Sequence, residues 1–237
     1  MRRNIYLLWG ATTTGKTALS VSVAKERGWP VIALDRFQGY HEISTGSGAP
    51  TNNELEKTER IYITPQRSLA DGIISAKDYN YWLKRRVLSL PEGKSDFIIE
   101  GGSVSLLKEM VSDEFWADFL WEIKILRAPS KDFFIKKAKR RITDMLHPED
   151  GRPSIMDEVS SFFMNHKTIH PLEDIDGYRT IIDYCRCKKI GFDKLNIMTN
   201  DQEKIIISRI AEEYYAHALW QEKETPCFPQ SWSKRFC

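Results

Sequence analysis

Short apolar runs alternate with amphipathic stretches in the first half of the chain. The apolar runs predict buried strands at residues 5–9, 31–34, 97–100 and 121–126. The amphipathic stretches between them predict helices at residues 16–27, at residues 75–89 and directly after Ser103. Gly28 ends the first of these helices, and Pro30 prevents its continuation. Strands that alternate with helices in this way are typical of a mostly parallel sheet.

Beyond Arg127 the pattern becomes mainly helical. Helices are expected at residues 131–146, 155–165, 177–188 and 202–221, and one further strand is expected at residues 195–198. Residues 1–127 would then form an α/β core. Residues 128–237 would form a mainly helical C-terminal part packed on that core, either as a separate unit or within one integrated domain.

The residues between the first strand and the first helix, from Gly10 to Thr17, read Gly-Ala-Thr-Thr-Thr-Gly-Lys-Thr. They form a complete G-x-x-x-x-G-K-[ST] phosphate loop in the strand–loop–helix context that this motif requires. The glycines allow backbone N–H groups to face a polyphosphate, Lys16 adds a positive charge, and the Thr17 hydroxyl can bind Mg²⁺. The motif predicts an α/β fold of the P-loop NTPase type, a phosphorylated substrate and Mg²⁺ as cofactor.

Two further features lie at the same predicted edge of the sheet. Asp35 follows the second strand, where a carboxylate can accept a proton from an attacking nucleophile. It can equally cap the following turn or pair with Arg36. Residues 39–53 are rich in Gly, Ser, Thr, Pro and Asn and predict a long loop. Ligands of open α/β sheets bind beside such loops.

Composition and charge exclude several classes of protein. The 237 residues carry a formal charge of only +2, which argues against nucleic acid or a membrane as the main partner. No stretch approaches the ~20 apolar residues of a membrane span. The four cysteines have neither disulfide nor zinc spacing, as expected for free thiols in a reducing compartment. We therefore expect a cytoplasmic protein, and a monomer.

The second half of the chain holds three clusters of polar residues. Glu173, Asp174 and Asp176 precede a predicted helix, a position that electrostatics alone favours for acids. Tyr214 and His217 stand three apart on one helix face, as a packing pair or as ligands. The basic residues within 136–141 belong either to a solvated helix face or to a phosphate site.

Several segments, taken in order, resemble those of the bacterial adenylate isopentenyltransferases, a cytokinin-forming family related to the tRNA dimethylallyltransferases. The segments are the phosphate loop and residues 29–36, 44–48, 60–62, 100–103 and 173–179. Ala-Leu-Asp-Arg at 33–36 and Glu-Asp-Ile-Asp-Gly-Tyr-Arg at 173–179 are far more specific than the loop alone. The resemblance runs from the N-terminus to about residue 219 and leaves the tail from about residue 221 unmatched.

The resemblance implies transfer of a five-carbon prenyl group from dimethylallyl or hydroxymethylbutenyl diphosphate to N6 of AMP, with release of diphosphate. The residues implied in catalysis are Asp35, Thr12 and Lys16. Those implied in binding the donor diphosphate are Gly10, Thr13, Thr14, Gly15, Lys16, Thr17, Arg141 and Arg152, with Thr17 also on Mg²⁺. Those implied in binding AMP are Asp35, Ser47, Arg60, Ser103 and Asp174.

The prenyl-tail pocket is implied to contain Asp176, Tyr214 and His217. Asp176 and His217 match positions that are polar in bacterial members and apolar in plant relatives, so the hydroxylated donor should be accepted as well as dimethylallyl diphosphate. The sequence departs from the family where Glu149 replaces an arginine expected to bind the leaving diphosphate. Arg152 or Arg141 would substitute for it.

Three alternatives remain open from the residues alone. A small-molecule or nucleoside kinase would use the same loop for ATP and Asp35 as its base. A tRNA-modifying prenyltransferase would need additional RNA-binding mass and a basic face. A nucleotide-sensing module would bind AMP without forming a product. Release of diphosphate without any need for ATP separates the first alternative from prenyl transfer.

Overall fold

The computed structural model describes residues 2–63, 68–91, 96–128 and 130–232. In this part of the chain, parallel strands form one five-stranded sheet in the order β3-β2-β4-β1-β5. The strands are β1 (Asn4–Gly10), β2 (Val31–Leu34), β3 (Arg60–Ile61), β4 (Phe97–Gly101) and β5 (Leu120–Leu126). The predicted parallel sheet is confirmed, with β3 as an additional strand of two residues. Sequence periodicity cannot detect so short a strand.

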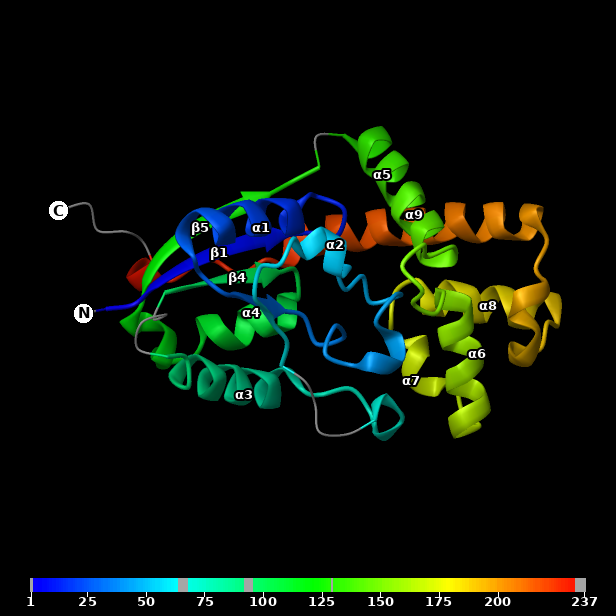
Figure 1. Ribbon diagram of the computed structural model, residues 1–237, viewed down its shortest axis with the longest axis horizontal. Coiled ribbons are helices and arrows are strands. Elements are labelled where there is room, and N and C mark those ends of the chain that lie inside the picture. Colours follow the sequence, from blue (N-terminus) through cyan, green and yellow to red (C-terminus); the bar gives the residue numbers. More distant parts are fainter. Residues whose placement is uncertain (1, 64–67, 92–95, 129, 233–237) are drawn as a thin grey trace.

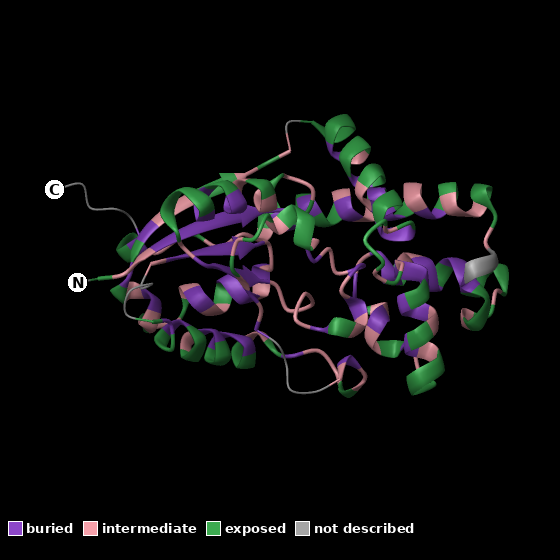
Figure 2. Ribbon diagram, in the orientation of Figure 1, coloured by how far each residue is buried: buried purple, intermediate pink, exposed green. Residues whose placement is uncertain are grey.

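Helices cover both faces of this sheet (Figure 1). They are α1 (Lys16–Arg27), α3 (Ala76–Leu88) and α4 (Val104–Val111), close to the predicted ranges. Val23 and Ala24 of α1 pack on Tyr6 and Leu8 on one face. The opposite face packs on α3 and α4 around Trp116. The central strands β1, β2 and β4 are buried, whereas β5 at the edge of the sheet is partly exposed (Figure 2). Strands covered on both faces consist almost entirely of apolar residues, which explains why the runs read as continuous.

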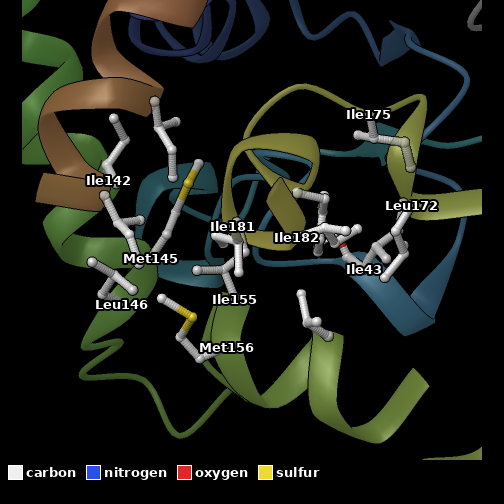
Figure 3. Close-up of a cluster of buried hydrophobic side chains, with 14 of the residues drawn as sticks. Ile43, Ile142, Met145, Leu146, Ile155, Met156, Leu172, Ile175, Ile181 and Ile182 are labelled. Carbon is white, nitrogen blue, oxygen red and sulfur yellow. Dashed lines mark hydrogen bonds between the residues drawn. The ribbon is translucent and has the colours of Figure 1, made fainter. Parts of the chain in front are cut away.

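The second half folds as a helical layer with its own apolar cluster (Figure 3). Its helices are α5 (Lys131–Leu146), α6 (Ile155–His166), α7 (His170–Glu173), α8 (Tyr178–Lys188) and α9 (Asn200–Glu224). Thr199 caps α9 in a capping box with Gln202, so this helix begins before the predicted position. The cluster also takes in Tyr40 and Ile43 from the loop after β2.

The strand predicted at residues 195–198 is wrong. Residues Phe192–Ile197 form a 3₁₀ helix (η5), which packs against α6. Leu195 is buried in the helical cluster, so its apolar character reflects packing between helices and not pairing of strands. A short apolar run cannot distinguish these two outcomes.

The loop predicted at residues 39–53 is more ordered than expected. It contains a 3₁₀ helix at His41–Ile43 (η1) and a short helix, α2 (Asn52–Leu55), capped by Thr51. Between them, residues 44–48 form a compact turn, which we call the Ser47 turn.

The end of the chain returns to the sheet. The side chain of Gln221, in the last turn of α9, donates a hydrogen bond to the carbonyl of Gly102. The indole of Trp232 stacks on that of Trp121 in β5, with ring centroids 3.8 Å apart. Residues 221–232 thus pack on the sheet, although the predicted boundary between residues 127 and 128 assigns them to the helical part. In the described ranges, no helix has the length and apolar character needed to cross a membrane.

Candidate active site

The phosphate loop connects β1 to α1 in a conformation that depends on glycine. Gly10 adopts φ +156°, and a Cβ at this position would collide with the carbonyl oxygen of Leu126. Gly15 at φ +91° immediately precedes α1. Thr13 also has a positive φ, +63°, which is strained for a β-branched residue. Its hydroxyl oxygen is buried and has no hydrogen-bond partner in the described structure.

The loop engages its own lysine. The Lys16 ammonium donates a hydrogen bond of 2.6 Å to the carbonyl oxygen of Ala11, and the Thr14 hydroxyl donates one of 2.7 Å to the same atom. Burial lowers the pKa of Lys16 to about 8, against the opposing influence of the Glu100 and Asp35 carboxylates. A phosphate ligand would exchange the Ala11 carbonyl for a full negative charge, a stronger partner for an ammonium group.

Glu100, at the end of β4, forms the floor of the site. Only 4% exposed, it accepts hydrogen bonds from the Thr17 hydroxyl at 3.2 Å, the Ser20 hydroxyl at 2.6 Å and the Arg60 guanidinium at 2.7 Å. Burial opposes ionisation, but the charge and hydrogen bond of Arg60 outweigh it and lower the pKa of Glu100. Arg60 also donates to Gln38, so both terminal nitrogens of its guanidinium have partners, while its buried Nε has none among the described residues.

The residues here fit the implied Mg²⁺. The Thr17 hydroxyl oxygen and a Glu100 carboxylate oxygen lie 3.2 Å apart, and both are the hard oxygen ligands that Mg²⁺ binds. Mg²⁺ in phosphate sites is usually held by one or two protein oxygens together with waters and substrate phosphates. Sequence reasoning named Thr17 but missed Glu100, whose position at the end of a strand beside β1 was the available indication.

Asp35 lies at the carboxyl end of β2. One of its oxygens accepts the backbone N–H groups of Phe37, at 2.8 Å, and Gln38, at 3.3 Å. Burial raises the pKa of Asp35, while these hydrogen bonds and the charges of Arg60 and Lys16 act in the opposite direction. The residue therefore caps its turn and also remains in electrostatic contact with the phosphate loop. Capping the turn and accepting a proton, the two roles that the sequence leaves open for Asp35, are therefore compatible.

The two candidate arginines reach the Ser47 turn and the residue after it. Arg141 donates to the carbonyl oxygen of Gly48 at 3.3 Å and pairs with Glu54 at 3.0 Å. Arg152 donates to the carbonyl oxygen of Ala49 at 3.1 Å and pairs with Asp150 at 2.8 Å. Both guanidiniums thus have partners within the protein.

The implied tail-pocket residues come together from two distant segments. The His217 ring lies 2.6 Å from the Asp176 carboxylate, and Arg179 pairs with both Asp176 and Glu213. Tyr214, one turn along α9 from Ala218 and two turns from Gln221, is buried against Gly177. The segment at residues 174–177, which we call the Asp176 turn, is held by the hydrogen bond from the Gly177 N–H to Glu213, at 2.8 Å.

Four other candidate residues have few contacts with the rest of the site. Ser103 precedes α4, with its hydroxyl 3.3 Å from that of Ser105. Asp174 is exposed, and its side chain makes no hydrogen bond or ion pair with the described residues. Thr12 is exposed on the phosphate loop. Glu149 is also exposed, close in sequence to the Asp150–Arg152 ion pair.

A cavity of about 220 Å³ opens beside the phosphate loop. Ala11 and Thr14 line one side, and α5 and α9 line the other through Phe134 and Tyr215. Lys131 and Glu222 contribute charge at its margin, so the lining is mixed in character. The cavity leaves room for a substrate group between the loop and the helical layer.

Comparison with known proteins identifies a family. The isopentenyl transferase model matches residues 3–236. The adenylate dimethylallyltransferase of Pantoea agglomerans pv. gypsophilae is 93% identical over 236 residues, covering 100% of both chains. That of Ralstonia solanacearum is 41% identical, covering 97% of both chains. A solved tRNA isopentenylpyrophosphate transferase from Staphylococcus epidermidis shares the fold, with a TM-score of 0.71 over 96% of this chain and 92% of its own, at 13% identity.

Proposed function

The chain belongs to the isopentenyl transferase family and is therefore a prenyltransferase, and we propose that it transfers a five-carbon prenyl group from dimethylallyl or hydroxymethylbutenyl diphosphate to N6 of AMP. The adenylate as acceptor follows from its likeness to adenylate dimethylallyltransferases over the whole chain. The observation on which the mechanism rests is that the parallel strands β1 and β2 bring the phosphate loop with Lys16 and the carboxylate of Asp35 to the same edge of the sheet.

The donor diphosphate is the leaving group. The backbone N–H groups of the loop and the Lys16 ammonium would bind its oxygens and stabilise the negative charge that grows as the C1–O bond breaks. Thr17 and Glu100 would hold Mg²⁺, which would neutralise part of that charge. The buried Thr13 hydroxyl, which has no partner among the residues that the structure describes, supplies a further donor.

The acceptor is an aromatic amine and a weak nucleophile. Its N6 lone pair forms the new N–C bond, the electrons of the C1–O bond leave with diphosphate, and the N6 proton passes to Asp35. A carboxylate can perform this task when the amine becomes acidic only as the bond forms. Burial raises the pKa of Asp35 toward the range that suits a base at neutral pH.

A product assay by mass spectrometry tests the proposal. The protein is incubated with AMP and Mg²⁺ and, separately, with each of the two donors. ATP and tRNA serve as competing acceptors. The expected result is an AMP adduct carrying one prenyl group, formed without ATP, and a loss of about 10²- to 10⁴-fold in kcat for Asp35→Asn. Adducts on tRNA alone, or phosphate transfer from ATP, would contradict the proposal.

A further inference from the structure

Glu158 is a buried carboxylate that the proposed reaction does not use. It lies near the start of α6, is 2% exposed, and belongs to none of the segments that carry the family resemblance. It accepts hydrogen bonds from the backbone N–H groups of Thr45, at 2.7 Å, and Gly46, at 2.9 Å. The Tyr178 hydroxyl donates a third, at 2.5 Å. Burial raises the pKa of Glu158, while the hydrogen bonds from Tyr178, Thr45 and Gly46 act in the opposite direction, so the charge of this carboxylate depends on all three donors.

These hydrogen bonds attach the backbone of the Ser47 turn to helix α6. A Cβ on Gly46 would collide with the Tyr178 hydroxyl, so the turn lies in direct contact with that ring. The Thr45 hydroxyl also donates to the carbonyl oxygen of Pro153, at 2.8 Å. Within the turn, Ser47 follows directly, with its N–H bonded to the carbonyl oxygen of Ile43, at 2.9 Å. The turn therefore has little freedom to shift while these hydrogen bonds are intact.

The Asp176 turn is held differently. Gly177 and Thr180 donate to Glu213 of α9, at 2.8 and 2.7 Å, and His217 of the same helix contacts Asp176. These contacts do not involve Glu158. None of these contacts uses the Tyr178 hydroxyl, which bonds Glu158 instead, so its removal leaves this second set of bonds in place.

We propose that Glu158 and Tyr178 are positioning residues for the acceptor nucleotide, which act by fixing the Ser47 turn. This inference rests on the proposed function and on the roles that the family resemblance implies, with Ser47 on AMP and Asp176 in the pocket for the prenyl tail. The two substrates should then respond unequally when the hydrogen bond between Glu158 and Tyr178 is lost.

The test compares steady-state constants for both substrates in Tyr178→Phe, with Tyr184→Phe as the matched control. Tyr184 lies on the same helix, is equally buried, and has its ring beneath Arg209 rather than against the Ser47 turn. We expect Tyr178→Phe to raise KM for AMP by about tenfold and to change KM for dimethylallyl diphosphate by less than about twofold. Tyr184→Phe should leave both values close to those of the wild type.

Glu158→Gln provides a second variant. Its amide keeps one oxygen acceptor but replaces the other with an NH₂ group, which cannot accept, so either the Thr45 or the Gly46 N–H loses its partner and a larger rise in KM for AMP is expected. Thermal unfolding of each variant separates positioning from general destabilisation. Equal rises in both KM values, or a lowered Tm with neither KM changed, would overturn the inference. Absence of any AMP adduct with the wild type would instead overturn the proposed function and this inference with it.

Discussion

The phosphate loop and the helical side of the site are built in opposite ways. The loop consists of consecutive residues, and its lysine, threonines and glycines are recognisable in the sequence because their spacing is local. The helical side joins residues more than a hundred positions apart, such as Thr45 and Glu158, through buried hydrogen bonds. The phosphate-binding motif common to many proteins is thus encoded locally, while the side chains that we propose to select the acceptor and the donor tail are brought together by tertiary packing.

The largest effect is expected at the floor of the phosphate loop, where the site does depend on a distant residue. Glu100→Gln leaves the Arg60 guanidinium buried without its charge partner and should lower the free energy of unfolding by about 3–5 kcal/mol. Glu56→Gln breaks the exposed pair with Lys25 and serves as control, with an expected loss of about 0–1 kcal/mol. Urea unfolding measures both. Similar small losses would show that the Glu100–Arg60 pair does not support the loop.

Substitutions on the helical side of the site should change the selectivity between the two prenyl donors. Replacement of Asp176 by Val and His217 by Leu removes the polar partners for a donor hydroxyl. The ratio of kcat/KM between hydroxymethylbutenyl and dimethylallyl diphosphate should fall by about 5- to 150-fold, which corresponds to about 1–3 kcal/mol for an unpaired hydroxyl. Competition between the two donors in one reaction measures this ratio directly. An equal loss with both donors would contradict a role in selectivity.

The pH dependence of donor binding tests the contribution of Lys16 in the phosphate loop. Lys16 has a pKa of about 8 in the free protein, so it is mostly charged at pH 7 and mostly neutral at pH 9. A neutral lysine loses its attraction for diphosphate. The Kd of dimethylallyl diphosphate should therefore rise by up to about tenfold between pH 7 and pH 9, as measured by calorimetry. Lys16→Arg should bind with little change over this interval, since arginine stays charged throughout.

The smallest effect concerns strain in the loop. Thr13→Gly relieves the positive φ of a β-branched residue and should raise Tm by about 2–4 °C, in line with about 1 kcal/mol. It also removes the buried hydroxyl and should weaken donor binding. Lys57→Gly is the control, because Lys57 has a similar φ of +68° outside the loop. This control should gain stability without any change in donor affinity.

Much of the fold follows from the sequence because fully buried strands and amphipathic helices have clear periods. The sequence does not predict β3, because a strand of two residues has no period. The short apolar run of η5 predicts a strand, although its Leu195 is buried between helices. Glu158 lies within the helix predicted at residues 155–165, and nothing in that segment distinguishes it from other polar helix positions. Its partners are backbone N–H groups of a distant turn, which leave no trace in residue identity.

Helix α9 and the segment after it have a consequence for the order in which the molecule is completed. The Trp9 indole, next to the phosphate loop, donates a hydrogen bond to the hydroxyl of Thr225 at 3.1 Å. Trp121 of β5 is covered by the stacked ring of Trp232. During synthesis the N-terminal sheet emerges first, yet its packing is finished only when the last segment leaves the ribosome. A chain shortened near residue 220, or a bulky fusion placed there, would act like a mutation in the core beside the loop.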